Sequence, residues 1–451
     1  MKFRALKAAF YSFALEHYWI IKPFFDGLPV SYKNYFRRDF KHNIQPYLFE
    51  RLLGKAKLSS KFIFYEKDKY INKLTTNLAK GVNIISFPKG IFGLAQQAKT
   101  IGQSLEYMKV NSGYIDCGFL LPNATKETED NSVEDQILKN NIYNCNLISF
   151  NPDQLLAFYQ AKGNSFFNKR YNIHYGAWEL AQYPKPWLYA TNLIHEFWAM
   201  SSFVQNAVAD SAPIPVLKMP YAIDFEIPHD ITRDSFSLPK NIFLFMFSYD
   251  MSSLTSRKNP EAVIKAFLQA FPKEKEVGLV IKISRDKNRE DHNHEWKKLI
   301  HKASEDSRFF IIDKSLSNRD MKGLINSCDC YVSLHRAEGF GMGMAEAMKM
   351  GKAVIATNYS GNTDFTRPDT ACVVDYKLIP IKPDEYVYYE KGQVWADPNI
   401  EHAAQYMKTL YEDSVFYQKI ATAGKKFIDS NYNHQIIGER FCSRLKLLGL
   451  L

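Results

Sequence analysis

The chain of 451 residues has little of what marks a membrane or secreted protein. No stretch approaches the roughly 18 consecutive apolar residues of a transmembrane helix, so we expect no membrane span. Glu16 and His17 interrupt the short apolar run near the N-terminus, and no small-residue cleavage site follows, so we expect no signal peptide. The hydrophobic fraction of 46% is that of an ordinary globular protein, and the length predicts two or three domains.

Cysteine is also scarce. The six cysteines show neither the paired spacing of a zinc site nor the pattern of a disulfide framework. Such a pattern suits a reducing compartment, and we therefore expect a cytoplasmic protein.

The net charge of +10 is concentrated at one end of the chain. Residues 1–80 hold 16 Lys and Arg against 6 Asp and Glu, together with 18 aromatic residues. Phe3, Leu6, Phe10 and Phe13 recur at helical spacing, which predicts an amphipathic helix. This extension could lie on an anionic membrane surface, which would make the protein peripheral at the inner face of the membrane, or it could pack on the rest of the chain. No nucleic-acid-binding module is present, and we expect no nucleic-acid partner.

The stretch "CYVSLHRAEGFGMGMAEAMKMGKAVIAT" contains the most informative pattern. Residues 330–334 read as a buried strand, the glycines after Glu338 as a tight turn, and the residues from Met342 as a helix. Gly351 suits the C-terminal cap of that helix, and residues 353–357 read as the next strand. The sequence therefore predicts one strand–turn–helix–strand unit.

Such a unit favours a nucleotide. Backbone N–H groups at a helix N-terminus attract anions, and glycines let a phosphate approach closely. Glu346 lies five residues beyond Gly341, about 7–8 Å along a helix, which is near the span from a diphosphate to its ribose. Glu338 precedes the turn, where it could accept hydrogen bonds from a sugar beyond the diphosphate.

Glu338 to Glu346 resembles the E-x7-E motif of the retaining glycosyltransferases of family 4, and residues 351–365 resemble the segment that follows it. The resemblance covers residues 80–430. It implies an α/β GT-B fold with two Rossmann-like domains facing a central cleft, and alternating strands and helices along the chain independently favour such domains. We expect a basic aromatic extension over 1–80, an acceptor domain over 81–235, a nucleotide-sugar domain over 236–425, and a C-terminal helix over 426–451 that crosses back to the first domain.

The resemblance also implies roles for individual residues. Family members usually have an arginine after the first strand of the second domain and a lysine about five residues later. Lys258 matches that lysine, Tyr249 or its neighbour stands near the arginine position, and Arg257 is expected to compensate. The expected catalytic residues are Glu338, Arg257 and Lys258, the expected donor-binding residues are Gly339, Phe340, Gly341, Met342, Glu346, Gly93 and Lys314, and the expected acceptor-binding residues are His174 and Glu179.

The implied activity is a retaining transfer of a sugar from a nucleoside-diphosphate sugar to a glycan or lipid-linked acceptor, in bacterial surface polysaccharide synthesis. No Asp-x-Asp motif occurs, and the family implies neither a metal ion nor a cofactor. Two alternatives remain open at this point. One is a nucleotide-sugar epimerase or hydrolase on the same fold, and the other is a non-catalytic nucleotide-sugar-binding subunit of a polysaccharide assembly complex.

Overall fold

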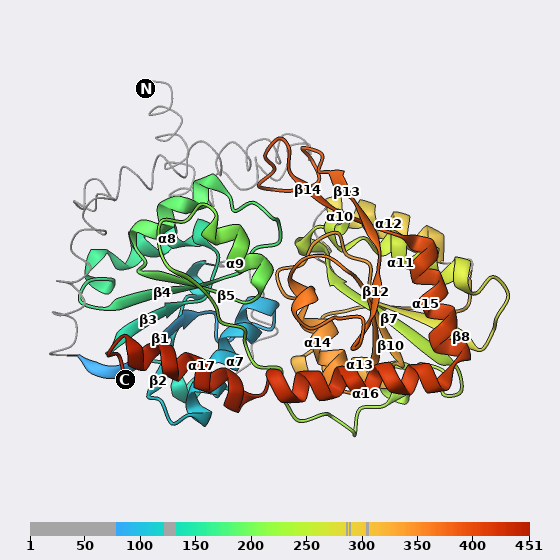
Figure 1. Cartoon of the computed structure of the whole chain (residues 1–451), viewed down its shortest axis with the longest axis horizontal. Helices are drawn as coiled ribbons and strands as arrows, with labels where there is room; N and C mark the ends of the chain where they lie inside the picture. The colour runs from blue at the N-terminus through green and yellow to red at the C-terminus, as the bar shows by residue number, and fades with distance from the viewer. Residues whose placement is uncertain (1–77, 121–131, 286, 288–289, 304–305) are drawn as a thin grey trace.

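The computed structural model describes residues 78–120 and 132–451, except 286, 288–289 and 304–305. Residues 1–77, and with them nearly all of the basic aromatic extension, lie outside the described residues. The described chain forms two α/β lobes side by side, each built on a six-stranded sheet (Figure 1).

The first sheet has the strand order β2-β1-β3-β4-β5-β6 and is parallel throughout. Its strands are β1 (Ala79–Ser86), β2 (Ser112–Asp116), β3 (Tyr143–Ile148), β4 (Tyr171–Gly176), β5 (Glu196–Ala199) and β6 (Val216–Lys218). The helices between them are α7 (Gly93–Tyr107), α8 (Pro152–Lys162) and α9 (Ser202–Ala209).

The second sheet has the order β12-β11-β10-β7-β8-β9 and is also parallel. Its strands are β7 (Phe243–Asp250), β8 (Val277–Ser284), β9 (Phe309–Asp313), β10 (Cys330–Ser333), β11 (Ala353–Thr357) and β12 (Cys372–Val374). Its helices are α10 (Thr255–Lys258), α11 (Pro260–Ala270), α12 (Glu290–Ala303), α13 (Asn318–Ser327) and α14 (Met342–Lys349).

The strands of the second sheet include apolar runs that are buried almost without interruption. In β8 every residue except Ser284 is buried, and β11 is buried along its whole length. Parallel strands covered by helices on both faces need apolar side chains on both sides, which produces such runs rather than an alternating pattern. β10 and β11 lie where the sequence predicts strands, at residues 330–334 and 353–357.

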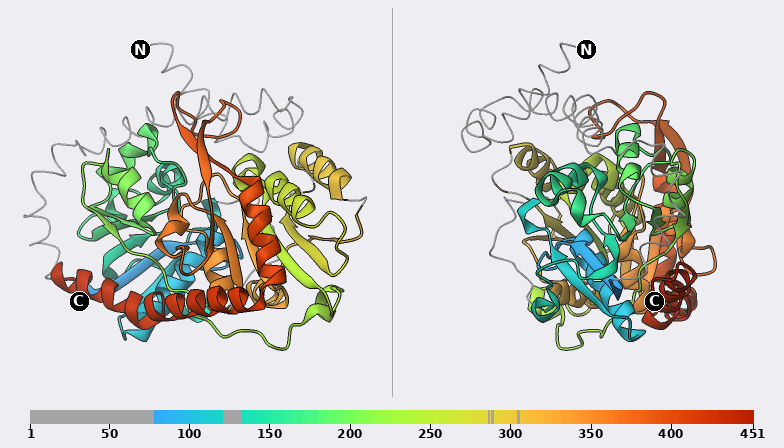
Figure 2. Two further views of the ribbon diagram at one scale, coloured as in Figure 1. Left: turned by 45° about the vertical axis from the view of Figure 1, so that its right-hand side comes forward. Right: turned by 90° about the vertical axis from the view of Figure 1, so that its left-hand side faces the viewer.

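The C-terminal helices join the two lobes along one side (Figures 1 and 2). They are α15 (Ile400–Glu412), α16 (Ser414–Asn431) and α17 (His434–Leu447), and α17 packs against α7 of the first domain. Arg444 of α17 contacts the fully buried Glu196 of β5 at 2.6 Å. The last helix thus returns to the first domain and is held there by a charged hydrogen bond.

A two-stranded antiparallel sheet joins the lobes on the side opposite α16 (Figure 1). It consists of β13 (Tyr376–Pro380) and β14 (Val394–Pro398), connected by residues 381–393. We call residues 376–398 the strap. Between the strap and the C-terminal helices, the carboxyl ends of the two sheets face one another.

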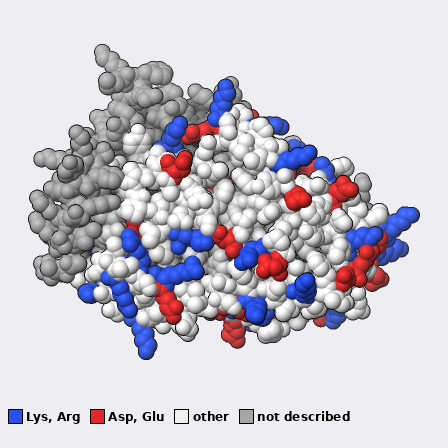
Figure 3. Space-filling view, viewed as in Figure 1, with Lys and Arg blue, Asp and Glu red and all other residues white. Residues whose placement is uncertain are grey.

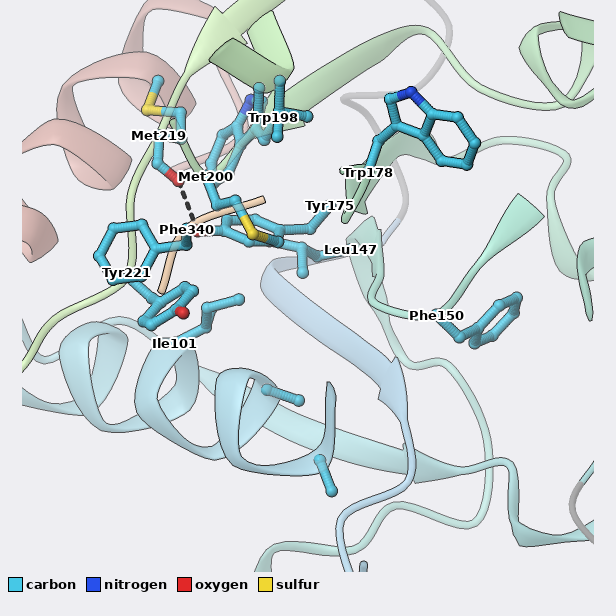
Figure 4. Close-up of a cluster of buried hydrophobic side chains, with 14 of the residues drawn as sticks. Ile101, Leu147, Phe150, Tyr175, Trp178, Trp198, Met200, Met219, Tyr221 and Phe340 are labelled. Carbon is cyan, nitrogen blue, oxygen red and sulfur yellow. Dashed lines mark hydrogen bonds between the residues drawn. The ribbon is translucent and has the colours of Figure 1, made fainter. Parts of the chain in front are cut away.

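Buried aromatic side chains fill the space where the lobes meet. Phe340 of the second domain lies 4.5 Å from Tyr221, measured between ring centres, next to Met200 and Met219 (Figure 4). Phe340 is only 2% exposed. On the molecular surface, acidic and basic side chains are interspersed over the described face, in keeping with the expectation that the excess positive charge belongs to residues 1–80 (Figure 3). No helix in the described part of the chain is both long and apolar enough to cross a bilayer.

Candidate active site

The strand–turn–helix unit predicted around Glu338 is present. β10 ends at Ser333, the chain turns through Gly339 and Gly341, and α14 begins at Met342. Gly341 has φ +97° and Gly351 has φ +72°, both in the left-handed region that glycine tolerates best. The glycines therefore set where the helix starts and where it ends.

Two backbone segments pass very close to each other at this turn. A Cβ atom added to Gly361 would lie only 1.9 Å from the carbonyl oxygen of Gly339, and one added to Gly339 would lie 2.7 Å from the carbonyl oxygen of Trp178. The Gly361 N–H donates to the carbonyl of Glu338 at 2.8 Å. Neither glycine position has room for a side chain, so the turn is held in one place by the loop after β11 and by the first domain.

The carboxylate of Glu338 lies between two cations. Lys258 Nζ is 2.5 Å from its Oε1 atom, and Arg257 Nη1 is 3.3 Å from the same atom. Burial by itself would raise the pKa of Glu338, but the charges of Lys258 and Arg257 outweigh it and lower the pKa to about 2. Glu338 is therefore ionised at neutral pH although it is only 8% exposed.

Arg257 and Lys258 are the last two residues of α10, which follows β7. Arg257 is buried: it donates from Nη1 to the carbonyl of Ala337 at 2.8 Å, and its Nη2 lies 3.7 Å from Glu179 Oε1. Burial opposes its charge, yet Glu179 and Glu338 raise its pKa above the ordinary value. Lys258 is the more exposed of the two cations: 21% of its side chain is accessible, against 5% for Arg257.

Buried polar side chains next to Glu338 form a hydrogen-bonded group. The Glu338 N–H donates to Ser360 Oγ at 2.8 Å. His335 is fully buried; its Nε2 lies 3.0 Å from Asn362 Oδ1 and its Nδ1 lies 3.0 Å from Ser333 Oγ. Burial lowers the pKa of His335, so the ring is neutral and bridges the ends of β10 and β11.

Glu346 is the fifth residue of α14 and is 8% exposed. Burial raises its pKa, and the charge of Lys322 on α13 opposes that shift in part. The Lys322 ammonium itself sits 4.1 Å from the ring centre of Phe225. No described residue donates a hydrogen bond to the Glu346 carboxylate, so its oxygens are available to the hydroxyl groups of a ligand.

The remaining donor-binding residues predicted from the sequence differ in how deeply they are buried, and no hydrogen bond or ion pair joins Gly93 or Lys314 to Glu338 in the described part of the chain. Gly93 is the first residue of α7, and a Cβ atom there would meet nothing within 4 Å. Lys314 is exposed just after β9, near the ring of Phe236, and Met342 is partly buried at the start of α14. Phe340 belongs to the core between the lobes rather than to the surface of the cleft.

His174 and Glu179, the expected acceptor contacts, differ in their surroundings. His174 is fully buried in β4, and its Nε2 lies 2.7 Å from the carbonyl oxygen of Phe150. Burial lowers its pKa to about 4, so the ring is neutral. Glu179 follows β4 and reaches across the cleft, where its Oε2 accepts a hydrogen bond from the Tyr386 hydroxyl at 2.6 Å. A role at the acceptor stays a prediction for both.

Asn259 directly precedes α11, whose first residue is Pro260, but its side chain does not cap that helix. Asn259 has φ +54°, and its amide donates to the carbonyl of Leu334 at 3.1 Å. Tyr249 is buried near the end of β7, where its ring packs on Phe247, so the guanidinium in the cleft comes from Arg257. Asn259 thereby ties the helix carrying Arg257 and Lys258 to the strand that precedes Glu338.

Sequence reasoning missed Ser360, His335, Asn362 and Tyr386. The first three lie in or beside the stretch that carried the resemblance, and their polar side chains next to buried strand ends are a signal that could have been used. Tyr386 had no such signal, because it is 207 positions from Glu179 in the sequence. In the part of the chain that the structure describes, no group of three or more His, Cys, Asp or Glu side chains is arranged to hold a metal ion.

Comparison with known families supports a glycosyltransferase. Residues 233–427, less than half of the chain, match the model of the family described as glycosyl transferases group 1. The matched segment contains Arg257, Lys258, Glu338, Glu346 and the strap. A search of curated proteins finds no match.

Several solved structures share the fold of this chain. HepE of Anabaena, solved in complex with UDP and glucose, aligns with a TM-score of 0.59 at 16% identity over 81% of this chain and 99% of that chain. Sucrose-phosphate synthase of Thermosynechococcus elongatus aligns with 0.59 at 12% identity over 82% and 99%. A glycosyltransferase of Rickettsia africae aligns with 0.58 at 15% identity over 82% and 98%. At these identities the likeness shows the fold, and it confirms the expected GT-B architecture of two Rossmann-like domains.

Proposed function

We propose that this protein is a retaining glycosyltransferase that moves a sugar from a nucleoside-diphosphate sugar to a hydroxyl group of a glycan or a lipid-linked acceptor. The observation that carries the proposal is the Glu338 carboxylate between Lys258 and Arg257, at the turn that opens α14. The match of residues 233–427 to group 1 glycosyl transferases supports the same class of reaction.

The diphosphate would enter between Lys258 and the start of α14. Free N–H groups at the helix N-terminus and the ammonium of Lys258 both favour an anion there. Glu346 would accept hydrogen bonds from the ribose, and Glu338 would hold the hydroxyl groups of the donor sugar. When the diphosphate binds, Lys258 exchanges part of its contact with Glu338 for contact with phosphate oxygen atoms.

In the transfer step, the bond between the anomeric carbon and the diphosphate oxygen breaks. A bond from the acceptor hydroxyl oxygen to that carbon forms on the same face, and the acceptor proton passes to an oxygen of the leaving phosphate. Negative charge grows on the diphosphate during this step. Lys258, Arg257 and the amides near Gly341 are preorganised to stabilise it, which is the largest single source of catalysis in many enzymes.

The acceptor would approach from the first domain, whose sheet presents its carboxyl edge to the same cleft. We propose a glycan or lipid-linked acceptor of the kind used in bacterial surface polysaccharides, at the inner face of the membrane. The basic aromatic residues 1–80 are the part of the chain with the composition to bind an anionic surface. Binding of the full chain to vesicles with and without phosphatidylglycerol tests this, and equal binding to both would contradict it.

The first experiment is thermal unfolding with UDP, GDP, ADP and TDP, each at millimolar concentration. A ligand at 100 times its Kd adds about 2.7 kcal/mol of stability, which is a readily measured shift in Tm. Stabilisation by one nucleotide identifies the base and narrows the donor to the sugars carried on that nucleotide, and the anomeric configuration of the product with the donor that is turned over is then read by NMR. Lys258→Met keeps the length of the side chain and should abolish most of the shift.

Metal removal is the matched control. Because the cations at the diphosphate are supplied by protein side chains, we expect turnover and nucleotide binding to be unchanged by EDTA. No stabilisation by any of the four nucleotides would overturn the proposal. Inversion at the anomeric carbon would overturn its retaining part alone.

A further inference from the structure

The strap lies on the side of the molecule opposite α16 (Figure 1), and its hydrogen bonds reach the segments that carry Glu338, Arg257 and Lys258. Ala396 N–H donates to the carbonyl of Arg336 at 3.0 Å, two residues before Glu338. Ser256 Oγ donates to the carbonyl of Glu385 at 3.0 Å, so the connecting residues of the strap rest on the short helix that ends with Arg257 and Lys258. The strap is therefore attached to both segments that supply the cluster.

The far end of the strap is packed into the first domain. Tyr386 and Tyr388 are 7% and 4% exposed. Their ring centres lie 5.7 and 6.1 Å from that of Trp178, and Tyr388 lies 4.8 Å from Trp187. Because these side chains are buried against first-domain tryptophans, the Tyr386 hydroxyl has a defined position in the cleft.

The Tyr386 hydroxyl is linked to Arg257 by the carboxylate of Glu179. Tyr386 donates to Glu179 Oε2 at 2.6 Å, and Glu179 Oε1 lies 3.7 Å from Arg257 Nη2. Burial and the charge of Glu179 raise the pKa of Tyr386 well above its ordinary value, so the hydroxyl keeps its proton and remains a donor. Both oxygens of Glu179 are thus engaged within the protein.

Glu179 also completes a charge balance. Arg257 and Lys258 bring two positive charges, and Glu338 and Glu179 bring two negative ones. Without Glu179, the cluster would carry one net positive charge, and Arg257 would be held by Glu338 and its backbone contacts alone. A negative carboxylate near a diphosphate weakens the binding of that anion. We therefore expect Glu179 to contribute to another step than diphosphate binding.

We propose that Tyr386 is a positioning residue: by holding Glu179, it fixes the Arg257 guanidinium in the orientation that transfer of the sugar requires. The proposal rests on the proposed function and deepens it. Tyr386 does not touch the reacting atoms, and its effect passes entirely through Glu179. Removing the hydroxyl should therefore change turnover, and should have no effect once Glu179 has lost its charge.

The test compares Tyr386→Phe, Glu179→Gln and the double variant. Tyr388→Phe is the matched control, because it removes a hydroxyl of the same strap that bonds Asp153 rather than Glu179. Calorimetry measures the Kd of pyrophosphate and of UDP at low and high salt. Steady-state assays with the donor that the nucleotide screen selects measure kcat and the KM of donor and acceptor.

We expect Glu179→Gln to bind pyrophosphate about three- to tenfold more tightly at low salt, with the gain shrinking at high salt, because one nearby negative charge is lost. Its kcat should fall about tenfold. Tyr386→Phe should lower kcat about three- to tenfold with the Kd of pyrophosphate unchanged. The double variant should be no slower than Glu179→Gln, since residues that act through one another are not additive. Tyr388→Phe should keep the wild-type kcat.

Three results would overturn the proposal. Additive losses of kcat in the double variant would show that Tyr386 acts by packing. An unchanged kcat in Tyr386→Phe would remove its role altogether. If Glu179→Gln raises only the KM of the acceptor, and leaves kcat and the KM of the donor unchanged, Glu179 binds the acceptor and does not position Arg257.

The proposed function fails in different ways. If the wild type binds pyrophosphate but transfers no donor sugar, the transferase proposal falls, and the role of Tyr386 in transfer falls with it. If the sugar is transferred but the losses of kcat in the double variant are additive, the role of Tyr386 fails and the transferase proposal stands. A wild type that binds neither pyrophosphate nor any of UDP, GDP, ADP and TDP would overturn both proposals.

Discussion

Ser201 of the first domain donates its side-chain hydrogen bond to the backbone carbonyl of Gly339 in the second domain, at 2.6 Å. Gly339 directly follows Glu338, so the bond joins the loop after β5 to the turn of the candidate active site. Next to it, Ser202 N–H donates to Asp364 Oδ2 at 2.8 Å. The position of the turn thus depends on the closed arrangement of the two domains.

Ser201→Ala should destabilise the protein by about 1–2 kcal/mol, because Ser201 Oγ also accepts from Val204 N–H and caps α9. The urea midpoint measures the change. Ser202→Ala is the control, since it removes only a hydroxyl that accepts from Lys218 Nζ. A larger loss in Ser202→Ala than in Ser201→Ala would contradict the importance of the bond to Gly339.

Glu338 should make stability depend on acid pH. Its pKa falls from the usual 4.5 to about 2 in the folded protein, because its two cations outweigh burial. The unfolded chain therefore binds a proton before the folded protein does. The stabilisation is complete above pH 4.5 and is lost as the pH falls toward 2, for a total of about 3 kcal/mol. Unfolding of wild type and Glu338→Gln by urea across this window should show a steeper pH dependence in the wild type. Parallel curves would be evidence against the ion pairs.

Glu338 and Glu346 should affect different steps. Glu338→Ala should lower turnover about a hundredfold or more while the affinity for the nucleoside diphosphate holds or rises, because the sugar loses its contact and two cations lose a competing carboxylate. Glu346→Ala should weaken nucleotide binding about tenfold, as expected for loss of a hydrogen bond to a charged group. Calorimetry with the selected nucleotide and steady-state kinetics separate the two. Full activity and unchanged affinity in both variants would refute the site assignment.

Gly361 and Gly93 should respond oppositely to alanine. Gly361→Ala would bring a Cβ atom to 1.9 Å from the Gly339 carbonyl oxygen, so the turn must move and Tm should fall by several degrees with loss of turnover. Gly93→Ala has open space, and alanine favours a helix, so Tm should hold or rise. If the donor approaches Gly93 closely, the KM of the donor will nevertheless rise in that variant. Scanning calorimetry and donor titration distinguish the cases, and a stable, active Gly361→Ala would contradict the geometry.

The pattern of residues along the chain was enough to predict the fold class and the local unit at the site. β10 and β11 lie at the runs predicted as strands, 330–334 and 353–357, and α14 lies between Gly341 and Gly351 as the glycines indicated. These features are local: an apolar run without polar interruption needs cover on both faces, and a left-handed turn favours glycine. Before α11, by contrast, Asn259 has left-handed backbone angles rather than the extended ones of an N-cap, and its amide bonds a carbonyl 75 positions away, on Leu334.

The sequence by itself determined the two Rossmann-like domains, the carboxylates of the E-x7-E spacing and the neighbouring cations Arg257 and Lys258, but not the short helix α10 that ends with them. Only the tertiary structure decided which groups meet. Lys258 reaches Glu338 across 80 positions, and Tyr386 reaches Glu179 across 207. Such contacts depend on how two sheets and a strap are packed against one another. Packing is set by the sum of many buried surfaces rather than by any short stretch of residues.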